Sequence, residues 1–100
     1  MKRTTNGLPA IHPGEFLSET LGELGLTQAA FASAIGISPM RVSYLLKGLR
    51  PVTAELALLL GKALDQTPQY WLNLQTTYDL KIAQREMKKT LSKVRSLAMA

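Results

Sequence analysis

The sequence predicts an all-α fold, a single domain built from helices. Apolar residues recur at helical spacing in five stretches, and no stretch alternates apolar and polar residues as a strand would. The 100 residues are 46% hydrophobic, which is enough for one packed core and too much for a disordered chain. The predicted connections are short, about two to five residues each, as in a compact helical domain.

The first helix is predicted from Pro13 to about Leu24. Pro13 suits the first helical position, Glu15 lies in the first turn, where the helix dipole favours an anion, and Gly25 ends the helix. One face carries leucines at i, i+4 and i+7, namely Leu17, Leu21 and Leu24. His12 precedes this helix and has no nucleophile near it in sequence, so we expect it to have a structural role.

The second helix is predicted between the N-cap Thr27 and the stop residue Gly36, with Ile35 as its last residue. The third is predicted between the N-cap Ser38 and the stop residue Gly48. The inner face of the second helix is Phe31, Ala32 and Ile35, and the apolar stripe of the third is Val42, Leu45, Leu46 and Leu49.

The fourth helix begins after Thr53, and the fifth follows Thr67 and Pro68. The fourth carries apolar residues at i, i+3, i+4, i+7 and i+8, namely Leu56, Leu59, Leu60, Ala63 and Leu64. The fifth carries Trp71, Leu74, Tyr78 and Ile82. Because no breaker follows, we predict that the fifth helix is extended, to about Leu97.

Residues 28–48 have the pattern of a helix-turn-helix motif. Ala32 is small where two helices cross closely, and Gly36 lies where the turn needs a positive φ, which glycine adopts without steric cost. The second helix of such a motif enters the major groove of DNA. Its outward positions here include basic residues, so we predict DNA binding. The alternative is a helical module that uses the same packing to bind protein alone.

Composition excludes several other classes of function. There is no Cys and only one His, which excludes disulfide frameworks, zinc-thiolate and iron–sulfur sites, cysteine catalysis and multi-histidine metal sites. No Ser/His/Asp set, paired-carboxylate pocket or glycine-rich phosphate loop is present, so we expect neither an enzyme nor a cofactor. The longest apolar run is 56–60, and residues 1–7 lack a signal-peptide pattern, so we expect a cytoplasmic protein.

The net charge is +5, and residues 81–100 carry all of the excess. We divide the chain into a flexible N-terminal arm (1–10), a helix-turn-helix DNA-binding domain (11–82) and a basic C-terminal helical tail (83–100). Apolar residues recur at helical spacing in the tail, at Met87, Leu91, Val94 and Ala98. For this tail we consider a helix packed on a dimer, a frayed end, a non-specific DNA contact and a membrane-surface helix.

Several segments resemble a known family. The run TQAAFA (27–32), with Ile37-Ser38 and Val42-Ser43, resembles the lambda-repressor-like, XRE-type helix-turn-helix family. The flanking runs HPGE (12–15), YWLNLQ (70–75) and YDL (78–80) resemble the HigA antitoxins, also called VapI. The resemblance spans about residues 10 to 82. It implies a five-helix domain, a homodimer, autorepression of a small operon and a HigB-type toxin partner, an mRNA-cutting ribonuclease. A stand-alone XRE-type transcriptional regulator is the alternative.

The outward face of the third helix supplies the candidate DNA contacts. Arg41 can donate to O6 and N7 of guanine, and Met40 and Tyr44 can lie against a thymine methyl. The alternative for Arg41 is a phosphate contact, which positions the protein without reading sequence. The phosphate candidates are Gln28, Ser38, Ser43, Lys47 and Arg50. The resemblance implies that Gln28 touches a phosphate or braces the recognition helix, and the alternative is a simple solvated residue. The alternative for Lys47 and Arg50 is a solvated charge at a helix C-terminus, where cations are favourable.

Two further groups are candidate protein contacts. The first is Tyr70, Trp71, Leu74 and Tyr78, which we predict to form core or a dimer interface; a ligand-stacking site is the alternative. The second is the acidic ridge, formed by Glu15, Glu19 and Glu23 at i, i+4 and i+8. Like charges at this spacing cost about 0.2–0.5 kcal/mol per pair in an isolated helix. The ridge is either a solvated face that tolerates this cost or a contact for a basic toxin.

Overall fold

A computed structural model describes residues 9–98, and within that range the chain forms six α-helices and no strand. The helices are α1 (Pro13–Leu24), α2 (Gln28–Ile35), α3 (Pro39–Leu46), α4 (Ala54–Leu64), α5 (Pro68–Glu86) and α6 (Lys88–Ser92). The all-helical prediction is confirmed. Most of the predicted N-terminal arm, residues 1–8, lies outside the described residues.

Side chains cap the N-termini of the first five helices. Thr27 and Ser38 cap α2 and α3 as predicted, each accepting a hydrogen bond from a backbone N–H three residues on. Thr53 and Thr67 do the same for α4 and α5. The cap of α1 is His12, whose Nδ1 accepts from the N–H of Gly14 at 2.9 Å. These caps explain why the predicted helix starts were accurate, because a cap is decided by residues close together in the sequence.

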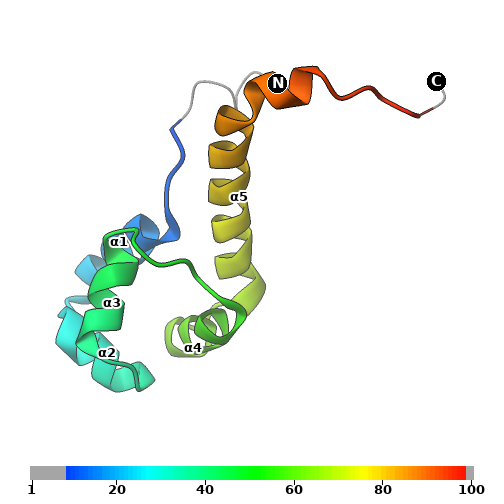
Figure 1. Ribbon diagram of the computed structural model, residues 1–100. Coiled ribbons are helices and arrows are strands. Elements are labelled where there is room, and N and C mark those ends of the chain that lie inside the picture. The colour runs from blue at the N-terminus through cyan, green and yellow to red at the C-terminus, as the bar shows by residue number, and fades with distance from the viewer. Residues whose placement is uncertain (1–8, 99–100) are drawn as a thin grey trace.

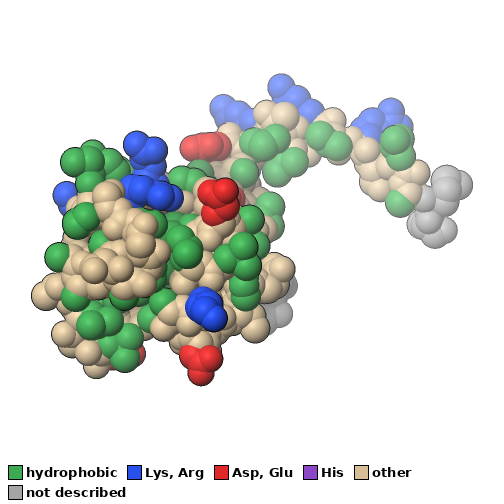
Figure 2. Space-filling model, turned by 90° about the horizontal axis from the view of Figure 1, so that it is seen from below, with side chains coloured by type: hydrophobic (Ala, Val, Ile, Leu, Met, Phe, Trp, Pro, Cys, Tyr) green, Lys and Arg blue, Asp and Glu red, His purple; other side chains and the backbone are tan. Residues whose placement is uncertain are grey.

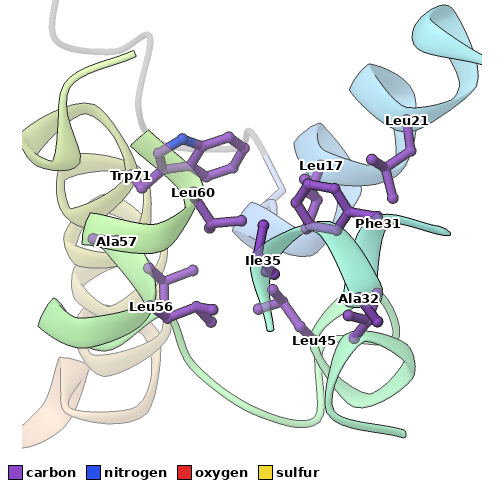
Figure 3. Close-up of a cluster of buried hydrophobic side chains, with 12 residues drawn as sticks. Leu17, Leu21, Phe31, Ala32, Ile35, Leu45, Leu56, Ala57, Leu60 and Trp71 are labelled. Atoms are coloured by element: carbon purple, nitrogen blue, oxygen red, sulfur yellow. The ribbon is translucent and has the colours of Figure 1, made fainter. Parts of the chain in front are cut away.

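The core joins two groups of helices. Figure 1 shows α1, α2 and α3 on one side and α4 with the beginning of α5 on the other. Figure 3 shows Leu17 and Phe31 from the first group pointing toward Leu60 and Trp71 from the second. Trp71 is only 1% exposed, and α5 packs chiefly against α4. Burial of these large apolar side chains holds the two groups together, at about 1.5–3 kcal/mol for each.

One residue of the predicted core stripe of α3 lies outside the core. Leu49 is 64% exposed, whereas Val42 and Leu45 are buried and Leu46 packs at the edge of the core. The helix ends at Leu46, and Gly48 then takes a positive φ of 76°. The turn carries Leu49 out of the helical register that the spacing assumed.

The prediction that the fifth helix continues to about Leu97 is wrong. Helix α5 ends at Glu86, Met87 breaks it, and the short α6 follows before residues 94–98 run on without helix. Figure 1 shows this segment leaving the body of the molecule, and α6 packs chiefly against α5. Helices in proteins are stabilised mostly by packing, and within residues 9–98 this segment lies away from the body of the molecule. Its cationic and apolar side chains are exposed instead (Figure 2).

No single helix within residues 9–98 is both long and apolar enough to cross a bilayer. Helices α2 and α3 reach the required apolar character only as a pair, bent by 116°. Their apolar residues Phe31, Ile35, Val42 and Leu45 lie in the core described above.

Candidate nucleic-acid interface

Helices α2 and α3 form a tight two-helix unit. The chain turns at Gly36, whose φ of 77° is left-handed and whose N–H donates to the carbonyl of Ala32. The two helix axes bend by 116°, inside the range of about 90–120° that helix-turn-helix units adopt. The predicted positive φ at Gly36 is therefore confirmed, and so is the tight turn that requires it.

The inner face of this unit is buried as predicted. Phe31, Ala32, Val42 and Leu45 are each at most 2% exposed, and Ile35 is buried beside them. Ile37 packs partly against the same cluster. With these residues held inside, the opposite face of α3 must point to solvent.

The three base-contact candidates share this outward face. Met40 is 62% exposed, Arg41 is exposed and Tyr44 is half-buried. They line one side of an open hollow of about 420 Å³ between α3 and the start of α4. Its lining is Ile37, Ser38, Met40, Arg41, Tyr44, Leu45, Arg50, Pro51, Thr53 and Leu56. Pro51 and Thr53 were not among the predicted site residues, because the sequence does not reveal that the segment after α3 folds back beside it.

Arg50 joins the same face through Tyr44. The guanidinium carbon of Arg50 lies 5.4 Å from the centre of the Tyr44 ring, which is a cation–π contact worth about 0.5–1 kcal/mol at an exposed site. This contact orders both side chains beside Arg41. Arg50 is nevertheless an exposed side chain, so a phosphate contact and a solvated charge both stay predictions for it.

The other phosphate candidates lie around the ends of α2 and α3. Gln28 is the exposed first residue of α2, and Lys47 is the exposed C-cap of α3. The Oγ of Ser38 already accepts a hydrogen bond from the N–H of Arg41 at 3.2 Å, which leaves its hydroxyl hydrogen free to donate. Ser43 is half-buried.

His12 supports the segment that connects this face to α4, a role that sequence reasoning did not assign. Its ring is buried, lies against the backbone of Gly48 and meets the Tyr78 ring edge-on, with 5.0 Å between ring centres. Burial lowers the pKa of His12 below its ordinary value of 6.5. A backbone hydrogen bond to Arg50 and the charges of Asp79 and Glu15 oppose this shift.

Gln75 supports the same segment from α5 and was also missed. Its Oε1 accepts from the buried N–H of Val52 at 2.8 Å, and its Nε2 donates to Oδ1 of Asp79 at 2.9 Å. The only sequence signal was a polar residue four positions after Trp71, on the buried face of the helix.

Replacing Gln75 with leucine is expected to lower the free energy of unfolding by about 1–3 kcal/mol, because the N–H of Val52 would stay buried without an acceptor. The matched control is Gln69→Ala, which removes an amide hydrogen bond to Asn73 on an exposed face of the same helix and should change stability by less than about 0.5 kcal/mol. Urea unfolding of both variants measures the difference. Equal losses of stability would show that the buried hydrogen bond of Gln75 contributes no more than the exposed bond of Gln69.

The four residues predicted for the dimer interface differ in how deeply they are buried. Trp71 belongs to the monomer core and is enclosed by its own chain, so it is unable to lie in a dimer interface. Tyr70 is 41% exposed and stands edge-on to Trp71. Leu74 and Tyr78 are half-buried, and Tyr78 already contacts His12.

The acidic ridge lies on α1 as predicted, with Glu15, Glu19 and Glu23 all exposed. In residues 9–98, no group of three His, Asp or Glu side chains is arranged to hold a metal ion.

The fold and this face define a helix-turn-helix domain. The helix-turn-helix family HTH_3 matches residues 17–71. The chain belongs to this family and, within it, to the group that contains the HigA antitoxins and virulence-associated protein I.

Three similar proteins illustrate this relationship. Virulence-associated protein I of Dichelobacter nodosus is 44% identical over 82 residues, which cover 81% of this chain and 76% of that protein. An addiction module antidote protein of the HigA family from Coxiella burnetii is 39% identical with a TM-score of 0.87, covering 91% of this chain and 100% of that one. The antitoxin HigA of Pseudomonas aeruginosa, solved with the higBA promoter, is 34% identical with a TM-score of 0.84, covering 89% and 99%.

Proposed function

We propose that this protein is a sequence-specific DNA-binding repressor that acts as the antitoxin of a toxin–antitoxin pair and represses its own operon. The observation that carries the DNA-binding part is the outward face of α3, where Met40, Arg41 and Tyr44 stand exposed or half-exposed beside Arg50. A similar protein, the Pseudomonas aeruginosa antitoxin HigA, was solved with promoter DNA, which supports the same use of the fold here. We assign the protein to the cytoplasm and give it no enzymatic role.

In this mechanism α3 lies in the major groove. Arg41 donates to O6 and N7 of a guanine, while Met40 and Tyr44 lie against thymine methyl groups. The phosphate contacts surround these residues and fix the register of α3 on the duplex. They come from Gln28, Ser38, Ser43, Lys47 and Arg50.

We propose a homodimer that presents two copies of α3 to a two-fold operator, with half-sites about one helical turn apart. Tyr70, Leu74 and the exposed edge of Tyr78 remain as candidate dimer contacts, without Trp71. Sedimentation equilibrium of the free protein tests this, and a monomer at the concentrations that bind DNA would contradict it.

The DNA-binding proposal is tested by fluorescence anisotropy with DNA from upstream of the protein's own gene, against scrambled DNA of equal length, over a salt series. We expect a preference of about 10³ or more for the upstream DNA, with affinity that falls as salt rises. Equal binding to both DNAs would indicate that only the positive charge of the tail attracts DNA. Absence of binding at low salt would favour a module that binds protein alone.

The toxin-binding part of the proposal places a HigB-type ribonuclease on the acidic ridge. A ribonuclease needs a basic surface to hold RNA, and Glu15, Glu19 and Glu23 present three exposed carboxylates to such a surface. The ridge lies on α1, whereas the candidate DNA contacts lie on α2, α3 and the segment after α3. DNA and the toxin would therefore bind separate faces of the protein. If no toxin partner exists, the protein is a stand-alone transcriptional regulator, which is the alternative function.

Reversing two charges of the ridge, in the double variant Glu19→Lys and Glu23→Lys, is expected to weaken toxin binding at least tenfold and leave upstream-DNA affinity nearly unchanged. The control is Glu55→Lys, at another exposed carboxylate, which lies on α4 and outside the ridge. Calorimetric titration with the toxin measures the first effect and anisotropy the second. Unchanged toxin affinity in the double variant would remove the ridge from the interface.

A further inference from the structure

Three parts of the chain converge on the ring of His12. The first is the start of α1, where Nδ1 accepts from the N–H of Gly14. The second is the segment 48–50, which leads from the candidate recognition helix to Arg50. The third is α5, where the ring meets Tyr78 edge-on. A single buried imidazole therefore connects the first and fifth helices to the end of the DNA-facing region.

The hydrogen bonds define the protonation state of the ring. Because Nδ1 accepts from Gly14, the neutral imidazole carries its proton on Nε2. The backbone of Arg50 lies near the same ring and favours its charged form. The neutral ring therefore caps α1 and at the same time packs against Gly48, which holds the segment 48–50 in place relative to α1.

We propose that His12 is a positioning residue for DNA binding: its neutral ring holds the segment 48–50 so that Arg50 stands beside Tyr44, and its protonation weakens operator binding. This inference rests on the proposed DNA-binding function. His12 acts through Arg50 and does not itself contact DNA, because its side chain is buried.

Protonation has a direct structural consequence. A proton on Nδ1 would face the N–H of Gly14, so the ring must turn and would lose its packing against Gly48. The titratable and charged groups around the ring are Glu15 on α1, Asp79 and Tyr78 on α5, and Arg50 on the segment after α3. The two carboxylates favour the charged ring, but burial opposes them and is the larger effect.

The sign of the stability effect follows from the lowered pKa. Between the folded-state pKa of His12 and 6.5, the unfolded chain binds more protons than the folded chain. The contribution of His12 to stability is therefore fully present above pH 6.5 and is lost as the pH falls through that window.

The key variant is His12→Asn. Asparagine is a good N-cap, so its Oδ1 can still accept from Gly14, but its side chain has no ring to pack against Gly48. The control variant is Thr67→Ala, which removes the N-cap of α5 at an exposed position away from the DNA-facing residues. It reproduces a loss of stability without touching the segment 48–50.

The first measurement is a pH titration of the full-length chain by two-dimensional NMR. We expect the amide signals of Gly14 and of residues 48–50 to shift with the same midpoint as the His12 ring in the wild type, and those of 48–50 to stay constant in His12→Asn. Signals of 48–50 that ignore the titration of His12 would overturn the proposal. This measurement tests the coupling between His12 and the segment 48–50 without DNA. If upstream DNA is not bound specifically, the proposed function fails, and the coupling is still measured.

The second measurement is upstream-DNA affinity across the same pH range. At pH 7.5 we expect His12→Asn to bind about three- to tenfold more weakly than the wild type, because the ring no longer packs against the segment 48–50, while Thr67→Ala binds like the wild type. As the pH falls below 6.5, the advantage of the wild type over His12→Asn should disappear. A constant ratio across the range, or equal affinities at pH 7.5, would overturn the positioning role.

Discussion

Replacing Gly14 with alanine is expected to destabilise the protein by about 3 kcal/mol or more and to lower its melting temperature by roughly 12–24 °C. A Cβ on Gly14 would lie 2.0 Å from the carbonyl oxygen of Leu45 and 3.1 Å from the Cα of Leu46. Both are backbone atoms of α3, so no side chain can move aside. Helix α1 would have to separate from α3, which holds the candidate DNA contacts.

The same helix supplies the control. Gly22 is exposed on α1 and has nothing within 4 Å of the position that a Cβ would occupy. Gly22→Ala should therefore raise the free energy of unfolding by about 0.5–1 kcal/mol, because alanine loses less backbone entropy in a helix. Thermal unfolding by circular dichroism measures both variants. A Gly14→Ala protein as stable as the wild type would contradict the close approach of α1 to α3.

Arg41→Ala is expected to reduce the preference for upstream over scrambled DNA by about 1–3 kcal/mol, or roughly 5- to 150-fold, because Arg41 is the residue placed to read a guanine. Lys47→Ala should behave differently, since a phosphate contact carries no sequence information. We expect it to weaken binding to both DNAs alike and to reduce the salt slope by about one.

Lys62 provides a matched control for charge. It is exposed on α4, outside the candidate DNA-facing residues, so Lys62→Ala should change affinity only slightly. Anisotropy titrations of the three variants at two salt concentrations separate the effects. If Arg41→Ala lost affinity equally for both DNAs, Arg41 would be a phosphate contact, which is the alternative that the sequence left open.

The helices of the first half of the chain could be predicted because their signals are local. Thr27 caps α2 with its own side chain, and Gly36 ends that helix with its own positive φ. The inner face of the helix-turn-helix could be predicted as well, since 3.6-residue periodicity places Phe31, Val42 and Leu45 on the apolar faces of their helices, which pack together here.

The supporting residues of the candidate site could not be predicted, because their partners are distant in sequence. Gln75 bonds to Val52 across 23 positions, and the Gly14 backbone meets α3 about thirty positions away. His12 could be recognised as the residue before a helix, but its contact with Tyr78 depends on how α5 packs. Spacing alone does not distinguish a residue that caps a helix from one that also holds a second element.

After Glu86 the sequence pattern predicts a continuous helix that does not form. Met87 and Leu91 are spaced as one helical stripe would be, and no proline or glycine interrupts them. The continuous helix does not form because no other element among the described residues covers the stripe, which leaves both residues more than two-fifths exposed. Periodicity predicts which face would be buried, whereas burial itself depends on whether a partner is present.

The central claim, that α3 reads DNA sequence through Arg41, is tested most directly by a double-mutant cycle. Wild-type protein and Arg41→Ala are titrated against upstream DNA and against versions with single guanines replaced. We expect one guanine whose replacement costs the wild type about 1–3 kcal/mol and costs Arg41→Ala almost nothing. Equal losses in the two proteins at every guanine would contradict the claim.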